Sequence, residues 1–225
     1  MFDIKCFATG SSGNSYLISK GKSHILIECG IPYNKLITNL SLNGLSLNDI
    51  DYCLVSHKHK DHSLCFNEVN KLLGNDKCFI TQENEPTINL NIGSIKVLAI
   101  SVNHGSEPCS AFILSDDEDT LLFATDFMEI EWNLKNFKFT QIMIECNYYE
   151  KYIDDLSPKE KRQINTHLGL NGLIIHLDSF DLSRCKEIYL IHLSRKYSDE
   201  MIMKATIETR YKIKTYVCQE NGGIK

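Results

Sequence analysis

The segment "SHKHKDHS", residues 56–63, places three histidines and an aspartate within six consecutive positions, directly after the apolar run "DYCLV". The apolar run predicts a strand. If the chain stays extended beyond it, His57 and His59 project to the same side, because side chains two residues apart on a strand share a face. A helix that begins near His62 then lets Asp61 and His62 face the same volume from another direction. The segment therefore predicts a cluster of side chains at the end of a strand.

Imidazole and carboxylate groups at this H-x-H-x-D-H spacing are suited to Zn²⁺, Fe or Mn²⁺. An open catalytic zinc site takes about three protein ligands, so four such groups from one segment indicate room for two ions. The alternative, a solvated polar start of a helix, does not account for four ligand-type residues at this spacing. The sequence thus favours a binuclear metal site.

Eleven short runs rich in β-branched and aromatic residues, bounded by turn residues, predict strands. They are "DIKCFA", "NSYLIS", "SHILIE", "DYCLVS", "KCFIT", "SIKVLAI", "SAFILS", "TLLFAT", "QIMIEC", "EIYLIH" and "IKTYVC". Helical patterns lie near 32–43, 62–73, 158–177 and 198–210, the last with Ser198 as its expected N-cap. This order favours an α/β fold in which two mixed sheets are covered on the outside by helices, a four-layer αββα sandwich, within one domain spanning 1–225.

The composition narrows the setting. A net charge of −5 argues against a protein that coats nucleic acid by bulk attraction. The N-terminus has no basic segment followed by an apolar run, and no stretch of about 18 apolar residues occurs. We therefore expect a cytoplasmic protein without a membrane partner. Nothing in the sequence indicates an oligomeric state.

The H-x-H-x-D-H motif after a strand resembles the signature of the metallo-β-lactamase fold of metal-dependent hydrolases, and this resemblance extends over nearly the whole chain. Three later residues match that family's further ligands, each after an apolar run: His104 in "SVNHGSEP", Asp126 in "FATDFM" and His192 in "IHLSRK". The resemblance implies two divalent ions, Zn²⁺ or Mn²⁺, with Fe also compatible. It assigns one ion to His57, His59 and His104, the other to Asp61, His62 and His192, and Asp126 to a position between them.

A second resemblance points to one branch of that superfamily. Four segments look like the YycJ-type proteins, which are related to its nuclease side: "GSSGNSYLI" (10–18), "IECNYY" (144–149), "THLGLN" (166–171) and "HLSRKYSDE" (192–200). The chain departs from that pattern in two places. "THLGLN" stands where a sequence like G-H-L-S-N is expected, and Glu28 in "LIECG" replaces the usual Asp.

The expected activity is hydrolysis of a phosphodiester by a metal-activated water, with Asp61 and His167 as catalytic residues. His167 is not needed as a ligand and could contact a phosphate oxygen or protonate a leaving group; its alternative is a structural hydrogen bond at a helix end. Further substrate-binding candidates are Ser12, Asn14, Asn147, Lys58 and Arg195. Cationic side chains expected around the same face are Lys58, Lys60, Lys161, Arg162, Arg195 and Lys196.

The gap between Asp126 and His192 is too short for a β-CASP insertion, so the expected substrate is single-stranded nucleic acid or a nucleotide. Two alternatives stay open. One is a thioester, lactone or amide hydrolase of the same fold, which needs no cationic rim. The other is a non-catalytic nucleotide-binding protein, which should have lost ligands that this chain retains.

Overall fold

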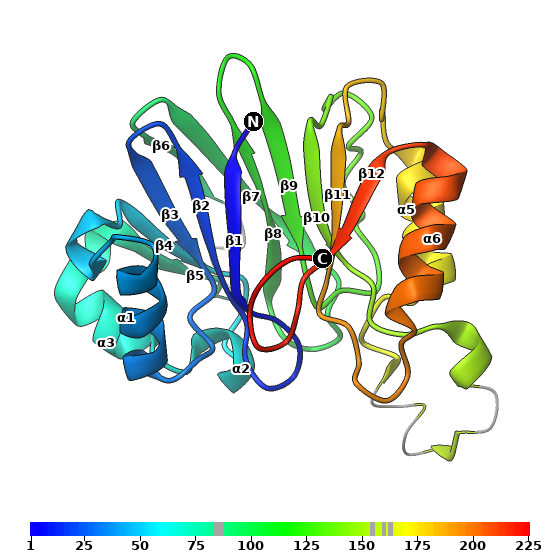
Figure 1. Ribbon diagram of the computed structural model, residues 1–225. Coiled ribbons are helices and arrows are strands. Elements are labelled where there is room, and N and C mark those ends of the chain that lie inside the picture. Colours follow the sequence, from blue (N-terminus) through cyan, green and yellow to red (C-terminus); the bar gives the residue numbers. More distant parts are fainter. Residues whose placement is uncertain (83–87, 154–155, 159–160, 162–163) are drawn as a thin grey trace.

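The strands form two mixed sheets, shown in the computed structural model of Figure 1, which describes residues 1–82, 88–153, 156–158, 161 and 164–225. The five-stranded sheet has the order β1-β2-β3-β4-β5 and the seven-stranded sheet the order β12-β11-β10-β9-β8-β7-β6. The bounds in the first sheet are β1 Asp3–Ala8, β2 Ser15–Lys20, β3 Ser23–Ile27, β4 Tyr52–Val55 and β5 Cys78–Ile80. Those in the second are β6 Ile88–Ile92, β7 Ile95–Val102, β8 Cys109–Ser115, β9 Thr120–Ala124, β10 Gln141–Glu145, β11 Glu187–Ile191 and β12 Lys214–Val217.

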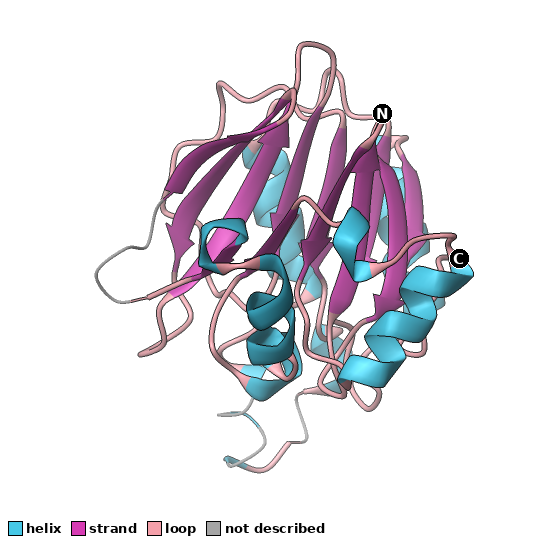
Figure 2. Ribbon diagram, turned by 90° about the vertical axis from the view of Figure 1, so that its left-hand side faces the viewer, coloured by secondary structure: helices cyan, strands magenta, loops and turns pink. Residues whose placement is uncertain are grey.

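Helices cover the outer face of each sheet. On the five-stranded side lie α1 Tyr33–Leu42 and α3 Phe66–Leu73, which stand in front of the strands in Figure 2, and on the other side lie α5 Leu170–Ser179 and α6 Glu200–Tyr211. The short elements are α2 Lys60–Ser63 and the 3₁₀ turns η1 Leu47–Asp49, η2 Asn75–Lys77 and η3 Glu150–Tyr152. The predicted four-layer αββα sandwich is confirmed.

Three hydrophobic cores hold these layers together. The middle core lies between the sheets, where residues such as Tyr16 and Phe112 are fully buried. The outer cores fill the spaces between each sheet and its helices, with Leu36 of α1 on one side and Leu173 of α5 on the other. Apolar residues alternate with polar ones at the edges but run continuously in central strands such as β10, because both faces of a central strand are covered.

The sequence missed one strand and misplaced several helix boundaries. Strand β6, "INLNI", pairs antiparallel with β7 across a tight turn at Gly93, whose φ is +58°. Its residues do alternate between apolar and polar, but two of the five are asparagines, which are depleted in strands. The helix expected over 62–73 is divided into α2 and α3. The helix expected over 158–177 lies partly outside the described residues, and α5 begins only at Leu170. Asp199, not Ser198, caps α6, since its side chain accepts a hydrogen bond from the Ile202 N–H.

The parallel strands end at one edge of the molecule. In the first sheet β3, β4 and β5 are parallel, and in the second β9, β10, β11 and β12 are parallel. Their carboxyl ends lie near α2, at the lower edge in Figure 1. Loops that follow parallel strands commonly supply the functional side chains of such sheets. No helix of the described residues is long and apolar enough to cross a membrane.

Candidate metal centre

The sheet edge near α2 gathers side chains that follow separate strands. His57 and His59 follow β4, Asp126 follows β9 and His192 follows β11 directly. Asp126 and His192 have left-handed backbones, with φ of 51° and 54°, and so does Glu28 after β3, with φ of 62°. This conformation is uncommon for residues other than glycine. The left-handed conformation turns the chain sharply after each strand. The paired strand that precedes each of these residues holds the turn in place.

The first cluster brings together His57, His59, His104 and Asp126. His57 Nε2 lies 2.9 Å from His59 Nδ1, and His104 Nε2 lies 3.4 Å from that same atom. Asp126 Oδ2 is 3.7 Å from His57 Nε2. Donor atoms this close and facing one another have the spacing of ligands around a single ion. Only His59 of this cluster is exposed to solvent.

The second cluster consists of Asp61, His62, Asp126 and His192. His62 Nε2 lies 3.4 Å from both Asp61 Oδ2 and Asp126 Oδ2. His192 Nε2 lies 3.6 Å from Asp61 Oδ2. Asp126 therefore belongs to both clusters, and His57 of the first lies next to His62 of the second, with ring centroids 4.2 Å apart. Seven ligand-type residues predicted from the sequence come together here, in the grouping that the resemblance implied.

The donor sets fit divalent cations. His192 Nε2 and His62 Nδ1 are buried and have no hydrogen-bond partner among the described residues. Buried polar atoms are rarely left without a partner. The His192 nitrogen faces the carboxylate of Asp61, so a cation between them would satisfy both. Imidazole nitrogens and carboxylate oxygens together suit Zn²⁺, Mn²⁺ and Fe.

Burial and neighbouring charges act differently on the histidines. Burial, reinforced by His62, lowers the pKa of His57 to about 2, which keeps its imidazole in the neutral form that binds metals. Burial alone would also lower the pKa of His192. Asp126, Asp61 and Glu145 outweigh that effect and raise it to about 10. Near neutral pH the His192 imidazole is therefore protonated, and it must lose a proton before it can bind a metal ion.

Glu145, the last residue of β10, is a buried carboxylate that sequence reasoning missed as a functional residue. Its Oε1 accepts hydrogen bonds from Nδ1 of both His167, at 2.8 Å, and His192, at 2.9 Å. Its Oε2 accepts from the backbone N–H groups of Phe127 and Leu168. Such bonds fix which nitrogen of each imidazole carries the proton and leave Nε2 free to act in the site.

His167 lies beside the clusters, with Nδ1 3.9 Å from Asp126 Oδ1 and its ring centroid 5.2 Å from that of His192. Its side chain is 19% exposed, more than those of His57, His62 and His192. Burial would lower its pKa, but Glu145 and Asp126 outweigh burial and raise it. These two carboxylates therefore favour the protonated form of this partly exposed imidazole.

Glu28 supports the histidine loop despite the substitution noted in the sequence. Its carboxylate accepts a hydrogen bond from the Ser56 N–H at 3.2 Å, and Oε1 lies 3.5 Å from His62 Nδ1. The longer side chain therefore reaches both the start of the loop and one of its ligand-type residues. Glu28 contacts the Nδ1 side of His62, as Glu145 contacts the Nδ1 side of His192.

The substrate-binding candidates lie in different environments. Asn14 and Asn147 are buried: the Asn14 amide contacts the Asp61 carbonyl and His62 Nε2, and the Asn147 amide donates to the His192 carbonyl. These contacts favour support of the ligand-type residues over contact with a substrate.

The exposed candidates flank the centre. Ser12 donates a hydrogen bond to Glu220, and Arg195 forms an ion pair with the same residue. The Ser12 hydroxyl and the Arg195 guanidinium are therefore both bound to the Glu220 carboxylate. Lys58 and Lys60 are exposed beside the centre. Arg162 lies outside the described residues. The substrate contacts of Ser12, Lys58 and Arg195 stay predictions.

Comparison with known proteins agrees with this geometry. Residues 5–73 match the family model described as anti-Pycsar protein Apyc1. Over 228 aligned residues the chain is 23% identical to exodeoxyribonuclease WalJ of Streptococcus pneumoniae, covering 87% of this chain and 82% of the relative. Among solved structures, YhfI of Bacillus subtilis, a metallo-β-lactamase fold protein, superposes with a TM-score of 0.69 at 15% identity, covering 99% of this chain and 98% of YhfI. Human tRNase Z, short form, superposes with a TM-score of 0.68 at 12% identity, with the same coverage.

These likenesses establish the class: the chain has the metallo-β-lactamase fold. The resemblance stated from the H-x-H-x-D-H motif is thus confirmed. Its finer part is supported by the similarity to WalJ, which is a YycJ-like exonuclease.

A glycine behind the second cluster provides a test. A Cβ on Gly30 would lie 1.7 Å from the Asp61 carbonyl oxygen and 2.6 Å from the His62 nitrogen. We therefore expect Gly30→Ala to displace α2, to lower stability by more than the roughly 1–3 kcal/mol typical of overpacking, and to remove one bound metal ion per chain. Thermal unfolding and elemental analysis measure both effects. Gly21→Ala is the control: a Cβ there meets no atom within 4 Å, so the variant should lose only the stability that its φ of +62° costs and should keep its full metal content. Full metal content with wild-type stability in Gly30→Ala would contradict the geometry.

Glu145→Gln tests the carboxylate behind His192 and His167. Each oxygen of the Glu145 carboxylate accepts hydrogen bonds from two N–H groups. In the glutamine variant, one of these oxygens is replaced by an NH₂ group, which cannot accept from the two N–H groups that it faces. We expect metal affinity to fall by roughly 10- to 100-fold, the usual effect of losing such a supporting group, as measured by competition with a chromogenic chelator. Glu187→Gln, at the far end of β11, should leave affinity unchanged. Wild-type affinity in Glu145→Gln would show that His192 is oriented without it.

Proposed function

We propose that this chain is a binuclear metal-dependent phosphodiesterase that cleaves single-stranded nucleic acid or a nucleotide. The observation that carries the proposal is the position of Asp126, whose carboxylate is shared by the first and the second donor cluster and also lies beside Glu145 and His167. One ion is assigned to His57, His59 and His104, the other to Asp61, His62 and His192, with Asp126 between them. We propose Zn²⁺ or Mn²⁺ for both positions, and the ligands also suit Fe.

When bound, two such ions lower the pKa of a bound water and stabilise negative charge on the reacting group. The chain's own residues supply the remaining requirements. Glu145 holds the His167 imidazole by Nδ1, so that Nε2 can donate a proton to a leaving oxygen or to a phosphate oxygen. Asp61 is the one partly exposed member of the second cluster, so a substrate reaches that cluster from its side. A group placed between these two side chains meets an acid on one side and the ligand cluster on the other.

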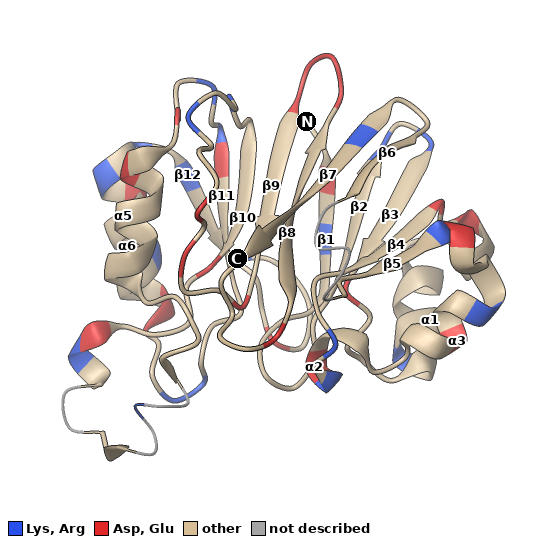
Figure 3. Cartoon of the chain, turned by 180° about the vertical axis from the view of Figure 1, so that it is seen from behind, with Lys and Arg blue, Asp and Glu red and all other residues tan. Residues whose placement is uncertain are grey.

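The distribution of charge supports a phosphodiester substrate. The acidic loop between β8 and β9, which carries residues 116–119, stands at the opposite edge of the molecule from α2 (Figure 3). Lys58 and Lys60 flank the candidate metal centre itself. The net charge of −5 therefore does not determine the local electrostatic potential around the candidate metal centre. The names of the similar proteins, an exodeoxyribonuclease and a tRNase, point to the same substrate class.

An activity screen tests the proposal. The protein, loaded with Zn²⁺ or Mn²⁺, is incubated with single-stranded DNA, duplex DNA, RNA, cyclic nucleotides and a thioester. We expect cleavage of single-stranded or nucleotide phosphodiesters, and a loss of turnover by orders of magnitude in Asp61→Ala, because loss of one ligand removes the second ion. Circular dichroism confirms that the variant is folded. Hydrolysis of the thioester alone, or full activity in folded Asp61→Ala, would overturn the proposal.

The role of His167 is tested separately from metal binding. We expect His167→Ala to keep its metal content and to lower kcat on a phosphodiester by roughly 10²–10⁴-fold, the range for a positioned general acid. The loss should shrink for a nitrophenyl phosphodiester, because that leaving group needs little protonation. His24→Ala, in which the lost imidazole lies at the start of β3 and bonds Ser19, is the matched control. An unchanged rate on natural substrates, or loss of an ion, would refute this role.

A further inference from the structure

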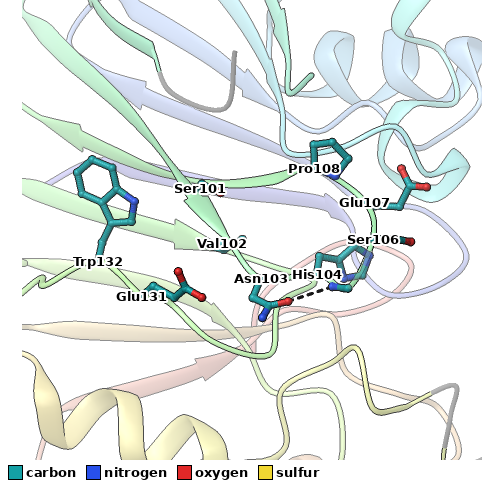
Figure 4. A pocket seen from close by; sticks show the side chains of 10 residues that line it. Ser101, Val102, Asn103, His104, Ser106, Glu107, Pro108, Glu131 and Trp132 are labelled. Atoms are coloured by element: carbon teal, nitrogen blue, oxygen red, sulfur yellow. Dashed lines mark hydrogen bonds between the residues drawn. The ribbon is translucent and has the colours of Figure 1, made fainter. Parts of the chain in front are cut away.

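A cavity of about 750 Å³ adjoins the candidate metal centre on the side of His104 (Figure 4). Its walls come from the end of β7, the loop that follows it and the segment at 131–132. Figure 4 shows Trp132 and Glu131 on one side of the space and Glu107 and Pro108 on the other. His104 belongs both to this wall and to the first donor cluster. A ligand whose reacting group lies at the centre can therefore extend into this cavity.

Trp132 is the only tryptophan of the chain, and 45% of its surface is exposed. Indole rings usually lie largely buried. Its segment is fixed to the wall that carries His104, because the Asn103 N–H donates to the Glu129 carbonyl at 3.0 Å and the Met128 N–H donates to the Asn103 carbonyl at 2.8 Å. The indole thus stands on a segment anchored next to the ligand-type residue, where a flat ring can stack on it.

The charges of the wall indicate which part of a substrate enters. Glu107 and Glu131 are exposed, and no lysine or arginine is among the described residues that line the cavity. Two carboxylates repel a phosphate but accept hydrogen bonds from amino groups, as they do from the amino group of cytosine. The volume lies within the range of small-molecule pockets, about 300–1,000 Å³, and suits a nucleoside.

We propose that this cavity receives an unstacked nucleobase of the substrate, stacked on Trp132, while the adjoining phosphate lies at the metal centre. Glu107 and Glu131 favour bases that carry an exocyclic amino group over thymine and uracil. This inference rests on the proposed phosphodiesterase function and names its substrate more closely. Aromatic side chains serve as stacking platforms of this kind in proteins that bind single strands.

Binding is measured without any reaction. Because Trp132 is the only indole, its fluorescence reports directly on the cavity of the Zn²⁺-loaded protein. Titration with dAMP should quench it to saturation, dTMP should bind several-fold more weakly, and deoxyribose 5-phosphate should leave it unchanged. The double variant Glu107→Gln/Glu131→Gln should remove the preference for dAMP. Equal quenching by all three compounds, or none by dAMP, would overturn the inference.

Kinetics separate this inference from the proposed function. On a single-stranded oligonucleotide, Trp132→Ala should lower kcat/KM on the order of 10- to 100-fold, the equivalent of one lost base stack, and Trp132→Phe should retain most of the activity. On the same oligonucleotide with an abasic site beside the scissile phosphate, Trp132→Ala and wild type should be equal. Equal loss on both substrates, or none on either, would overturn the base pocket and leave the phosphodiesterase proposal standing. Failure of the wild type to cleave any phosphodiester would overturn the function instead, whatever the fluorescence shows.

Discussion

The arrangement at the sheet edge depends on the buried carboxylate of Asp126. It is 2% exposed and lies within 4 Å of nitrogens of His57, His62, His167 and His192. A buried charge costs several kcal/mol unless it is paired, and its left-handed backbone adds about 1–3 kcal/mol. A chain keeps such a residue only where the surrounding structure determines its position, as the pairing of β9 with β8 and β10 does here. The histidines reach Asp126 from three places: His57 and His62 from the segment after β4, His167 from the residues before α5, and His192 from the end of β11.

A second layer of carboxylates makes that convergence possible. Glu28 and Glu145 are both fully buried, each stands behind a histidine of the second cluster, and each also accepts backbone N–H groups. They tie the imidazoles to strand ends of opposite sheets. The middle core joins the two sheets. The packing between these layers therefore sets the distance between the pair Glu28 and His62 on one sheet and the pair Glu145 and His192 on the other. The site is therefore as rigid as the sandwich that carries it.

The local spacing of the H-x-H-x-D-H segment predicted four ligand-type residues, and the resemblance to a known family added His104, Asp126 and His192, each of which follows an apolar run. His57, His59, Asp61 and His62 lie in one segment, and Asp126 and His192 follow strands that are easily recognised. Glu145 was not predicted, although it too ends an apolar strand. It lies in the segment "IECNYY", in which the sequence favoured Asn147 as the functional residue. The sequence also could not show that Asn14 and Asn147 face inward or that Glu220 occupies Ser12 and Arg195. Those contacts join residues far apart in the chain.

The charged side chains around the candidate metal centre fall into two groups. Under the proposed function, one group lies where the phosphate reacts and the other where the base is selected. Cationic Lys58 and Lys60 adjoin the donor clusters, whereas Glu107 and Glu131 line the cavity beyond His104. In the proposed substrate, a phosphate and the base attached to it have only one orientation that satisfies both groups of charges. The reverse orientation places the phosphate between carboxylates and the base among imidazoles. The loop from Asn103 to Pro108 carries both His104 of the first donor cluster and Glu107 of the cavity wall. Under the proposed function, changes at Glu107 therefore alter which base is accepted, whereas changes at His104 also affect the metal centre.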